Sequence, residues 1–336
     1  MRQVVIPRHG GPDVFEVRDA PEPVPGDGEI RVRVRAAGVN FADILARIGL
    51  YPDAPKPPVV VGYEVAGIVD AVGPGVTMPH EGDRVIALTR FGGYSDSVVV
   101  PAAQAFRFPD ELSDAEAAAV PVTYLTAAIA LYRMAALTSG EVVLVHNAGG
   151  GLGIAATQLA RLRRATVIGT ASAAKHDALR SFGVEHTIDY RHADVEEDVR
   201  RLTRGRGVDV ILDPIGGRSF LTSYRMLAPL GRLVMLGISS MASERRNPWL
   251  VFRSWWAMPA FNPLSLINRN RGVFGLNVGH LWEERSLQPL MSLLLTELSA
   301  GRLQPIVAKT FPLERAADAH RFIQSRANIG KVVLTT

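Results

Sequence analysis

Four consecutive apolar residues, Val142–Val145, begin the most regular stretch of the chain and predict a fully buried strand of a parallel sheet. Four glycines follow within residues 149–153, where we expect neither helix nor strand. Apolar side chains then recur at helical spacing over residues 154–163, which predicts a helix that begins just after the glycines. Residues 165–170 predict a second strand. Strand, glycine turn, helix and strand in this order are typical of a dinucleotide-binding unit.

The glycine turn has a chemical rationale. A pyrophosphate is negatively charged, and a helix N-terminus offers unpaired N–H groups and the positive end of the helix dipole. Glycines let the backbone approach such a group, because a Cβ atom would collide with it. The three glycine positions of the strict fingerprint hold Ala148, Gly150 and Gly153, with Gly151 and Leu152 between the last two. A glycine-rich turn that binds nothing is the alternative interpretation.

The chain before this unit contains short strands separated by turns. Apolar residues alternate with arginines over residues 30–34 and predict a half-buried strand. Further strands, each bounded by glycine or proline, are predicted over residues 65–72, 84–88 and 97–100. We interpret these strands as a small, partly closed antiparallel barrel. Ser113 and Glu116 then have the spacing of a capping box, which predicts an alanine-rich helix.

The chain after the glycine turn continues to alternate between helices and strands. Helices are predicted over residues 174–182, 195–203 and 219–227. Strands are predicted over residues 186–188, 208–213, 232–237 and 273–277. With the first two strands they predict a six-stranded, doubly wound parallel sheet of the α/β class. The tail predicts helices over residues 282–300 and 313–325 and a strand over residues 331–334, which we assign to the first domain.

The distribution of proline predicts the domain boundary. Of the 22 prolines, 14 fall at or before Pro121, and none lies between Val122 and Asp213. Proline is tolerated in turns and at strand edges but disrupts regular α/β structure. We therefore expect a discontinuous barrel domain of residues 1–121 and 279–336, and a dinucleotide-binding domain of residues 122–278.

Composition narrows the classes of function. The net charge is +4 and the arginines are scattered, so nothing favours nucleic-acid binding. The chain has no cysteine, and we expect His9, His80 and His146 to be isolated surface or turn residues, so we predict no metal site. Residues 1–10 lack the apolar core of a signal peptide, and the apolar stretch Ala117–Tyr132 is too short and too polar to span a bilayer. We expect a soluble, cytoplasmic protein.

Several motifs resemble those of a known family. The order of barrel, proline-poor dinucleotide domain and returning tail resembles the medium-chain dehydrogenase/reductase superfamily, which implies a Rossmann sheet and a GroES-like barrel. Similarity to its zinc-lacking quinone oxidoreductases is carried by residues 37–43, 49–51, 62–64 and 147–153. Similarity to the vesicle amine transport protein branch is carried by residues 169–176, 254–256 and 268–279. The positions that resemble catalytic zinc ligands hold Asn40 and Tyr63.

The resemblance implies a substrate site without zinc. Asn40 and Tyr51 are the candidates for hydrogen bonding a carbonyl oxygen that gains negative charge as hydride arrives, and Thr126 is a candidate nicotinamide contact. Asparagine is also common in turns, Tyr51 also fits loop packing and Thr126 an ordinary buried threonine, so these alternatives stay open. Asp43 is expected to orient the loop rather than to transfer protons.

The end of the second predicted strand points to NADPH as cofactor. An NAD-specific site places a carboxylate there, whereas this strand is followed by Ala171 and Ser172. The resemblance implies that Ser172, Lys175 and Tyr190 contact the 2′-phosphate, although Lys175 also fits a solvated helix position. Further cofactor contacts implied by the resemblance are Asn40, Thr126, Thr170, Gly237, Ile238, Phe274, Leu276, Asn328 and Lys331.

Three functions remain open at this point. The first is zinc-independent, NADPH-dependent reduction of a quinone or an α,β-unsaturated carbonyl. The second is a lipid- or membrane-associated protein of the same fold, and the third is a nucleotide-bound regulatory protein. Aromatic residues and arginines in the insertion 239–271 fit a lipophilic substrate mouth, a peripheral membrane contact or interdomain packing. We also predict a homodimer formed through the edge strand 273–277.

Overall fold

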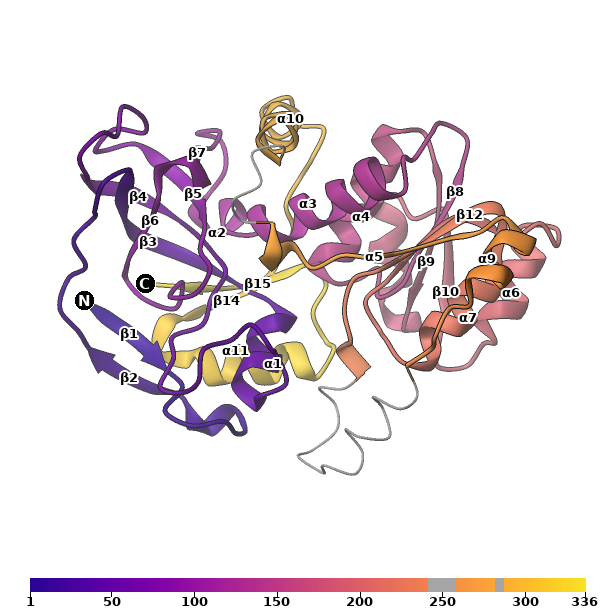
Figure 1. Ribbon diagram of the computed structural model, residues 1–336, viewed down its shortest axis with the longest axis horizontal. Coiled ribbons are helices and arrows are strands. Elements are labelled where there is room, and N and C mark those ends of the chain that lie inside the picture. The colour runs from indigo at the N-terminus through magenta and orange to yellow at the C-terminus, as the bar shows by residue number, and fades with distance from the viewer. Residues whose placement is uncertain (241–257, 282–286) are drawn as a thin grey trace. The chain divides into compact units, whose positions relative to one another are not determined.

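The computed structural model describes residues 1–240, 258–281 and 287–336, and the chain divides into two units (Figure 1). The first unit comprises Met1–Leu125 and Gly279–Thr336, and the second comprises Thr126–Val278. The first boundary lies inside helix α3 (Pro121–Ala128), four residues after the position indicated by the prolines. Pro121 begins this helix, where a missing N–H costs nothing, so the proline ends the turn-rich segment without interrupting the helix.

The second unit is built on a six-stranded parallel sheet with the order β10-β9-β8-β11-β12-β13. Its strands are β8 (Val142–Val145), β9 (Thr166–Ala171), β10 (His186–Asp189), β11 (Val208–Asp213), β12 (Leu227–Met235) and β13 (Gly272–Gly275). Strand β8 lies at the centre of the sheet, and the chain runs to one edge and then returns to build the other. This reversal of strand order is the doubly wound arrangement, so the predicted fold class is confirmed.

Helices cover both faces of this sheet, with α4 on one face and the α6–α7 pair on the other (Figure 1). The helices are α4 (Gly151–Leu162), α5 (His176–Ser181), α6 (Val195–Leu202), α7 (Arg218–Met226) and α9 (Pro263–Arg269), with a π-helical segment at Ile129–Met134. Ile168, Ile188 and Ile211 pack with Val199 and Phe220 in a buried core. The central strands β8, β9 and β11 are buried along almost their whole length, which explains why their sequences are mostly apolar.

One prediction about the helices in this unit was wrong. Helix α4 begins at Gly151 rather than after the glycines, because Gly150 is extended at the N-cap and the next residues are already helical. Within the insertion, the described residues form helix α9. The Asn262 side chain accepts a hydrogen bond from Leu264 N at 2.9 Å, and Pro263 occupies the first helical turn.

The first unit contains a sheet of seven strands with the path β14-β15-β3-β4-β5-β7, and β6 pairs with β3. Its strands are β3 (Glu29–Val39), β4 (Glu64–Val72), β5 (Arg84–Leu88), β6 (Ser97–Pro101), β7 (Ala105–Arg107), β14 (Val307–Pro312) and β15 (Lys331–Thr335), and β1 (Arg2–Val5) pairs with β2 (Glu16–Asp19) separately. We expected an antiparallel sheet, but β14 and β15 pair in parallel, so the sheet is mixed. Strand β15 places Val332 opposite Val39, so the tail returns to the first unit as predicted.

Four short helices complete the first unit together with the start of α3. They are α1 (Phe41–Ile48), α2 (Asp114–Ala117), α10 (Gln288–Ser299) and α11 (Ala316–Gln324). The predicted capping box is confirmed: Ser113 N donates to Glu116 Oε2 at 2.9 Å, and Glu116 N donates to Ser113 Oγ at 3.3 Å. The helical run Asp114–Met134 has the length and hydropathy of a membrane span, yet 72% of its most apolar window is buried, as in the core helix of a folded protein.

Candidate functional site

The glycine turn after β8 forms a cradle that side chains would fill. Asn147 adopts a left-handed conformation with φ of 54°, and Gly150 N donates back to Asn147 O at 2.9 Å. A Cβ on Gly153 would lie 2.5 Å from Asn147 O and 2.6 Å from Ala148 Cα, so this position requires glycine. The first helical hydrogen bond runs from Ile154 N to Gly150 O. The N–H groups of the preceding helical residues therefore lie at an open helix N-terminus, which suits a pyrophosphate.

The end of β9 brings Lys175 onto this turn. A Cβ on Gly149 would lie 3.0 Å from Lys175 Cδ and 3.5 Å from its Nζ, so the lysine side chain extends over the glycines. Ser172 precedes the 3₁₀ turn Ala173–Lys175, and Lys175 N donates to Ser172 O at 2.9 Å. The half-buried lysine thus places its positive charge beside the turn, where a neighbouring phosphate would be attracted to it.

The loop after β10 adds a residue that sequence reasoning missed. Tyr190 is 39% exposed, and the Arg191 guanidinium lies 6.0 Å from the centroid of its ring. The only signal for Arg191 in the sequence is that it directly follows Tyr190. Asp189, which precedes them, accepts hydrogen bonds from Arg191 N at 3.1 Å and from His192 Nδ1 at 2.7 Å. The hydrogen bond from His192 is the main reason that the pKa of Asp189 is lowered.

Other predicted cofactor residues lie at the carboxyl ends of β12 and β13, namely Gly237, Ile238, Phe274 and Leu276. A Cβ on Gly216, in the loop after β11, would lie 2.9 Å from Ile238 Cα, and Gly237 lies in the same close approach. Phe274 in β13 is 36% exposed, while Leu276 is 9% exposed and donates its N–H to Met235 O at 3.0 Å. In doubly wound sheets, ligands bind outside the carboxyl ends of the strands.

Thr170 and His146 are placed differently from the sequence predictions. Thr170 is 1% exposed, and its Oγ1 lies 3.1 Å from His146 Nδ1 and accepts from Asn147 N at 3.3 Å. The threonine side chain therefore points inward, under the turn. His146 lies in the turn after β8, as one of the two expectations had it, but it is 6% exposed and its Nε2 lies 3.1 Å from Ser223 Oγ, so it is not a surface residue. Burial lowers the pKa of His146.

In the first unit, Asn40, Glu64 and Lys331 form a buried polar cluster. Lys331 Nζ lies 2.5 Å from Asn40 Oδ1 and 2.5 Å from Glu64 Oε1, and Asn40 Nδ2 donates to Glu64 Oε1 at 2.8 Å. The side chains of Glu64 and Lys331 are 0% and 4% exposed. Two predicted residues distant in sequence are thus brought together by the β3–β15 pairing. Glu64 was given no role of its own from the sequence and was included only in the stretch 62–64 that resembles the quinone oxidoreductases.

This cluster determines which atoms of Asn40 can meet a ligand. Lysine has only donors and a carboxylate only acceptors, so the amide oxygen must face Lys331 and the amide nitrogen must face Glu64. The second N–H of Asn40 lies near Gly38 O at 3.5 Å, the limit of a hydrogen bond. A Cβ on Gly38 would lie 2.4 Å from Glu64 Oε1, so this glycine makes room for the cluster. The N–H of Asn40 that only Gly38 O holds is therefore the donor that a ligand could take.

Asp43 ties the loop before α1 to the rest of the unit. Its carboxylate accepts from Asn40 N at 2.7 Å, Gly62 N at 3.1 Å and Tyr94 Oη at 3.1 Å. Burial raises the pKa of Asp43 to about 7, against the hydrogen bonds and the nearby Lys331 charge, which lower it. These contacts fit the expectation that Asp43 orients the loop.

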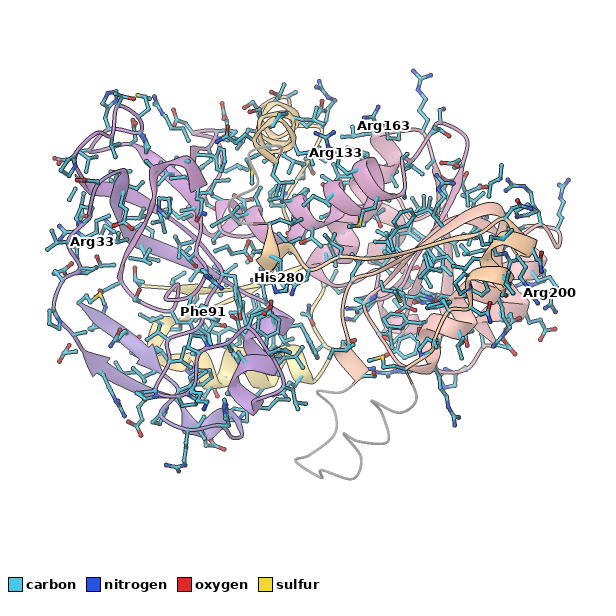
Figure 2. The ribbon with its side chains drawn as sticks, viewed as in Figure 1. Arg33, Phe91, Arg133, Arg163, Arg200 and His280 are labelled. Carbon is cyan, nitrogen blue, oxygen red and sulfur yellow. The ribbon has the colours of Figure 1, made fainter. Side chains whose placement is uncertain are left out.

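An aromatic group surrounds Tyr51. Its ring centroid lies 5.8 Å from that of Tyr63, which in turn lies 5.3 Å from Phe91, labelled in Figure 2. The Tyr63 hydroxyl is buried and has no hydrogen-bond partner among the described residues. Asp53 in the same loop pairs with His280 at 2.8 Å. Tyr51 thus packs against the ring of Tyr63, and both its substrate role and its packing role stay predictions.

The remaining predicted residues have simpler surroundings. Asn328 Nδ2 donates to Gly330 O at 2.9 Å, so its side chain supports the turn before β15. Thr126, at the start of the second unit, is 9% exposed. Met258 and Phe261 of the insertion pack into the core of the second unit, and Phe261 lies 5.5 Å from the Tyr224 ring, centroid to centroid. The other residues of the insertion that we singled out lie outside the described residues: Arg245, Arg246, Trp249, Phe252, Arg253, Trp255 and Trp256.

Possible metal ligands are dispersed. Over residues 1–240, 258–281 and 287–336, no three histidine, aspartate or glutamate side chains gather in a group that could hold a metal ion. His80 is a surface residue that pairs with Asp83 at 3.9 Å, and His9 packs against Gly49. At the positions that resemble zinc ligands, Asn40 is engaged with Glu64 and Lys331, and Tyr63 packs against aromatic rings.

Comparison with known proteins agrees with this geometry. Residues 26–110 match the family described as alcohol dehydrogenase GroES-like domain, and residues 182–334 match the family described as zinc-binding dehydrogenase. The chain is 41% identical over 339 residues to the synaptic vesicle membrane protein VAT-1 homolog of Danio rerio, covering 100% of this chain and 70% of that protein.

Two solved structures extend the comparison. The human synaptic vesicle membrane protein VAT-1 homolog-like protein has a TM-score of 0.87 and 33% identity, covering 100% of this chain and 98% of that one. The Escherichia coli quinone oxidoreductase complexed with NADPH has a TM-score of 0.88 and 30% identity, covering 100% of both chains. The chain therefore belongs to the medium-chain dehydrogenase/reductase superfamily, among the VAT-1 homologues and the quinone oxidoreductases.

Proposed function

We propose that this chain is an NADPH-dependent oxidoreductase that reduces a quinone or an α,β-unsaturated carbonyl without zinc. The observation that carries the proposal is the glycine cradle with Lys175 extended over it and no carboxylate at Ala171–Ser172. An open helix N-terminus accommodates a pyrophosphate, and a lysine beside it distinguishes a 2′-phosphate from a 2′-hydroxyl. The NADPH bound in the Escherichia coli relative is consistent with this assignment.

The bound nicotinamide would supply the hydride, and the residues of the chain would position and polarise the acceptor. Asn40 contributes an N–H donor whose orientation is set by Glu64 and Lys331. A carbonyl oxygen that gains negative charge is stabilised by such a preoriented donor and by the fixed Lys331 ammonium group. Tyr51 and its aromatic neighbours provide apolar surface suited to a quinone or enone.

The contacts of Ser172, Tyr190, Gly237, Ile238, Phe274 and Leu276 with the cofactor belong to the same proposal, as do those of Thr126, Asn328 and Lys331. The Thr170 hydroxyl is bonded to buried His146 and is not available to the cofactor. Thr170 would instead support the site through its backbone carbonyl oxygen, which accepts from Ala148 N in the glycine turn at 3.0 Å. A cytoplasmic location is consistent with this activity and is likewise a proposal.

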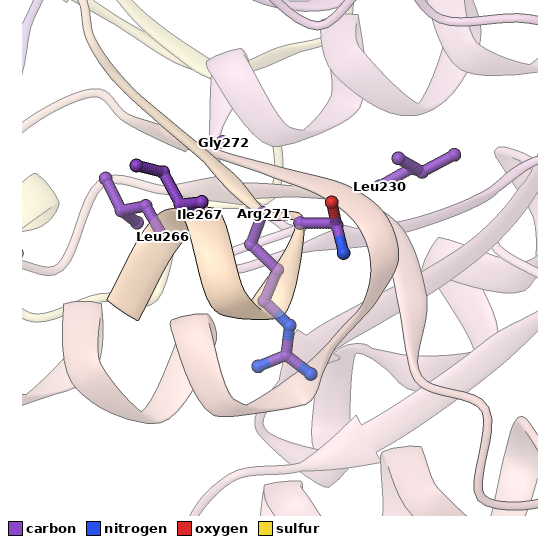
Figure 3. A pocket seen from close by; sticks show the side chains of 6 residues that line it. Leu230, Leu266, Ile267, Arg271 and Gly272 are labelled. Atoms are coloured by element: carbon purple, nitrogen blue, oxygen red, sulfur yellow. The ribbon is translucent and has the colours of Figure 1, made fainter. Parts of the chain in front are cut away.

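We infer that the protein is a homodimer. Strand β13 is the last strand of the described sheet, and an open groove of about 490 Å³ lies beside it, lined by Leu230, Leu266, Ile267, Asn270, Arg271 and Gly272 (Figure 3). Leu230, Leu264 and Ile267 are 74%, 69% and 68% exposed. An edge strand next to exposed apolar side chains is typical of a surface that pairs with a second copy.

The test of the activity is NADPH oxidation with a panel of quinones and enones, with simple alcohols and NADP⁺ as the comparison. Reduction of at least one quinone or enone supports the proposal, and alcohol oxidation without any quinone or enone reduction contradicts it. Co-sedimentation with anionic and neutral liposomes distinguishes the lipid-associated alternative. That alternative depended on aromatic residues outside the described part of the chain, and no described contact favours it.

A further inference from the structure

A buried chain of hydrogen bonds runs beneath the carboxyl edge of the sheet in the second unit. His146 follows β8 and lies between Thr170 on β9, 3.1 Å from its Nδ1, and Ser223 on α7, 3.1 Å from its Nε2. Ser223 Oγ donates to Asp213 Oδ2 at 2.7 Å, and Asp213 ends β11. The side chains of all four residues are buried, so the chain joins three adjacent strands and one helix away from solvent.

The partners determine where each proton lies. A carboxylate only accepts, so the single hydroxyl proton of Ser223 goes to Asp213, and Ser223 Oγ must accept from His146 Nε2–H. A neutral imidazole protonated on Nε2 has an acceptor at Nδ1. Thr170 therefore donates its hydroxyl proton to Nδ1, and its oxygen accepts from Asn147 N at 3.3 Å. Every donor then has one acceptor, which makes the Nε2–H tautomer the consistent arrangement.

At both ends of this series of hydrogen bonds, a side chain accepts from a backbone N–H group that borders the proposed dinucleotide site. At one end, Thr170 holds the N–H of Asn147, the left-handed residue that starts the glycine turn. At the other end, Asp213 accepts from Ile215 N at 2.8 Å and from Ser219 Oγ at 2.7 Å, which fixes the loop before α7. Gly216 in that loop approaches Ile238.

We propose that His146 is a positioning residue of the dinucleotide site, which as a neutral Nε2–H imidazole holds the glycine turn in register with the β11–α7 loop. This inference rests on the proposed NADPH-dependent function. A hydrophobic residue of similar size would fill the space but would leave Thr170 and Ser223 without their partner. The turn would then lose its preorganised shape, and binding would have to restore it at a cost in affinity.

The test compares NADPH binding by the wild type, His146→Leu and His146→Asn, measured by calorimetric titration. Leucine removes both hydrogen bonds, so we expect a roughly five- to thirtyfold higher Kd for NADPH. Asparagine retains an acceptor close to the position of Nδ1 and should recover part of that loss. The matched control is Asp209→Asn. Asp209 is a buried residue near the amino end of β11, far along the strand from the glycine turn, and its Oδ2 accepts from Val142 N at 2.9 Å. This control should lower stability and leave the Kd unchanged.

A second readout needs no cofactor and no folded variant of His146. Nitrogen-15 NMR of the wild-type imidazoles should show His146 as a neutral Nε2–H imidazole, and the signal of His146 is identified as the buried one that Ser223→Ala shifts. Wild type that fails to bind NADPH overturns the proposed function and this inference with it. If wild type binds and folded His146→Leu has the same Kd, or if the imidazole that Ser223→Ala shifts carries its proton on Nδ1, only this inference is overturned.

Discussion

Replacement of Lys175 by alanine tests the assignment of NADPH most directly. The lysine side chain extends over Gly149, and its ammonium group would pair with a 2′-phosphate but has no equivalent partner on NADH. A charge-assisted contact contributes about 1.5–3 kcal/mol, and 1.4 kcal/mol corresponds to a tenfold change in Kd. Because Lys175 is half-buried, solvent screens part of this interaction and the lower half of that range applies. We expect Lys175→Ala to weaken NADPH binding by roughly ten- to thirtyfold.

The assay is calorimetric titration of wild type and Lys175→Ala with NADPH and with NADH at two salt concentrations. NADH affinity should be nearly unchanged in the variant, and wild-type affinity for NADPH should fall more steeply with salt than that of the variant. Lys309→Ala is the matched control, because it removes the same charge from an exposed position in the first unit. The reasoning is refuted if wild type binds NADH as tightly as NADPH, or if the variant loses affinity for both cofactors equally.

Three further predictions follow from the other parts of the molecule. Asn40→Ala removes the proposed donor and should lower kcat for a quinone or enone by roughly tenfold or more, while the Kd for NADPH changes little; equal changes in both would contradict the oxyanion role. Ile267→Glu places a charge in the groove beside β13 and should convert a dimer into a monomer by light scattering, whereas Val24→Glu, an exposed residue of the first unit, should not. Burial raises the pKa of Asp43 from 3.8 to about 7, so the folded state retains a proton that the unfolded chain releases. The contribution of this group to the free energy of unfolding is therefore greatest below about pH 4 and is lost as the pH rises to about 7. Urea unfolding at several pH values should show a shallower decline for Asp43→Asn, and an unchanged slope would argue that Asp43 is ionised throughout.

Local elements that depend on residues close in sequence were predicted well. The strand Val142–Val145 has the predicted bounds, because an uninterrupted apolar run surrounded by turn residues can only be buried on both faces. The capping box at Ser113 also depends on residues close in sequence. The start of α4 was predicted after the glycines, because glycine has a low helix propensity. The helix nevertheless includes Gly151 and Gly153, and Gly153 lies so close to Asn147 O that no larger residue would fit there.

Contacts between distant segments were not visible in the linear pattern. Glu64 meets Asn40 and Lys331 only because β3 pairs with both β4 and β15, and no periodicity records such a pairing. His146 was taken for an isolated histidine, because its partners Thr170 and Ser223 lie 24 and 77 residues away in sequence. Their proximity follows from the order of the strands in the sheet.

The sequence by itself therefore determined the alternation of elements and the position of the glycine turn, since each depends on residues within a few positions of one another. The tertiary structure decided which polar side chains share a buried environment and which groups face the side chains of Asn40 and His146. These properties depend on hydrogen-bond partners that only the folded sheets bring together, because a buried donor or acceptor must be satisfied by whatever group lies within about 3 Å.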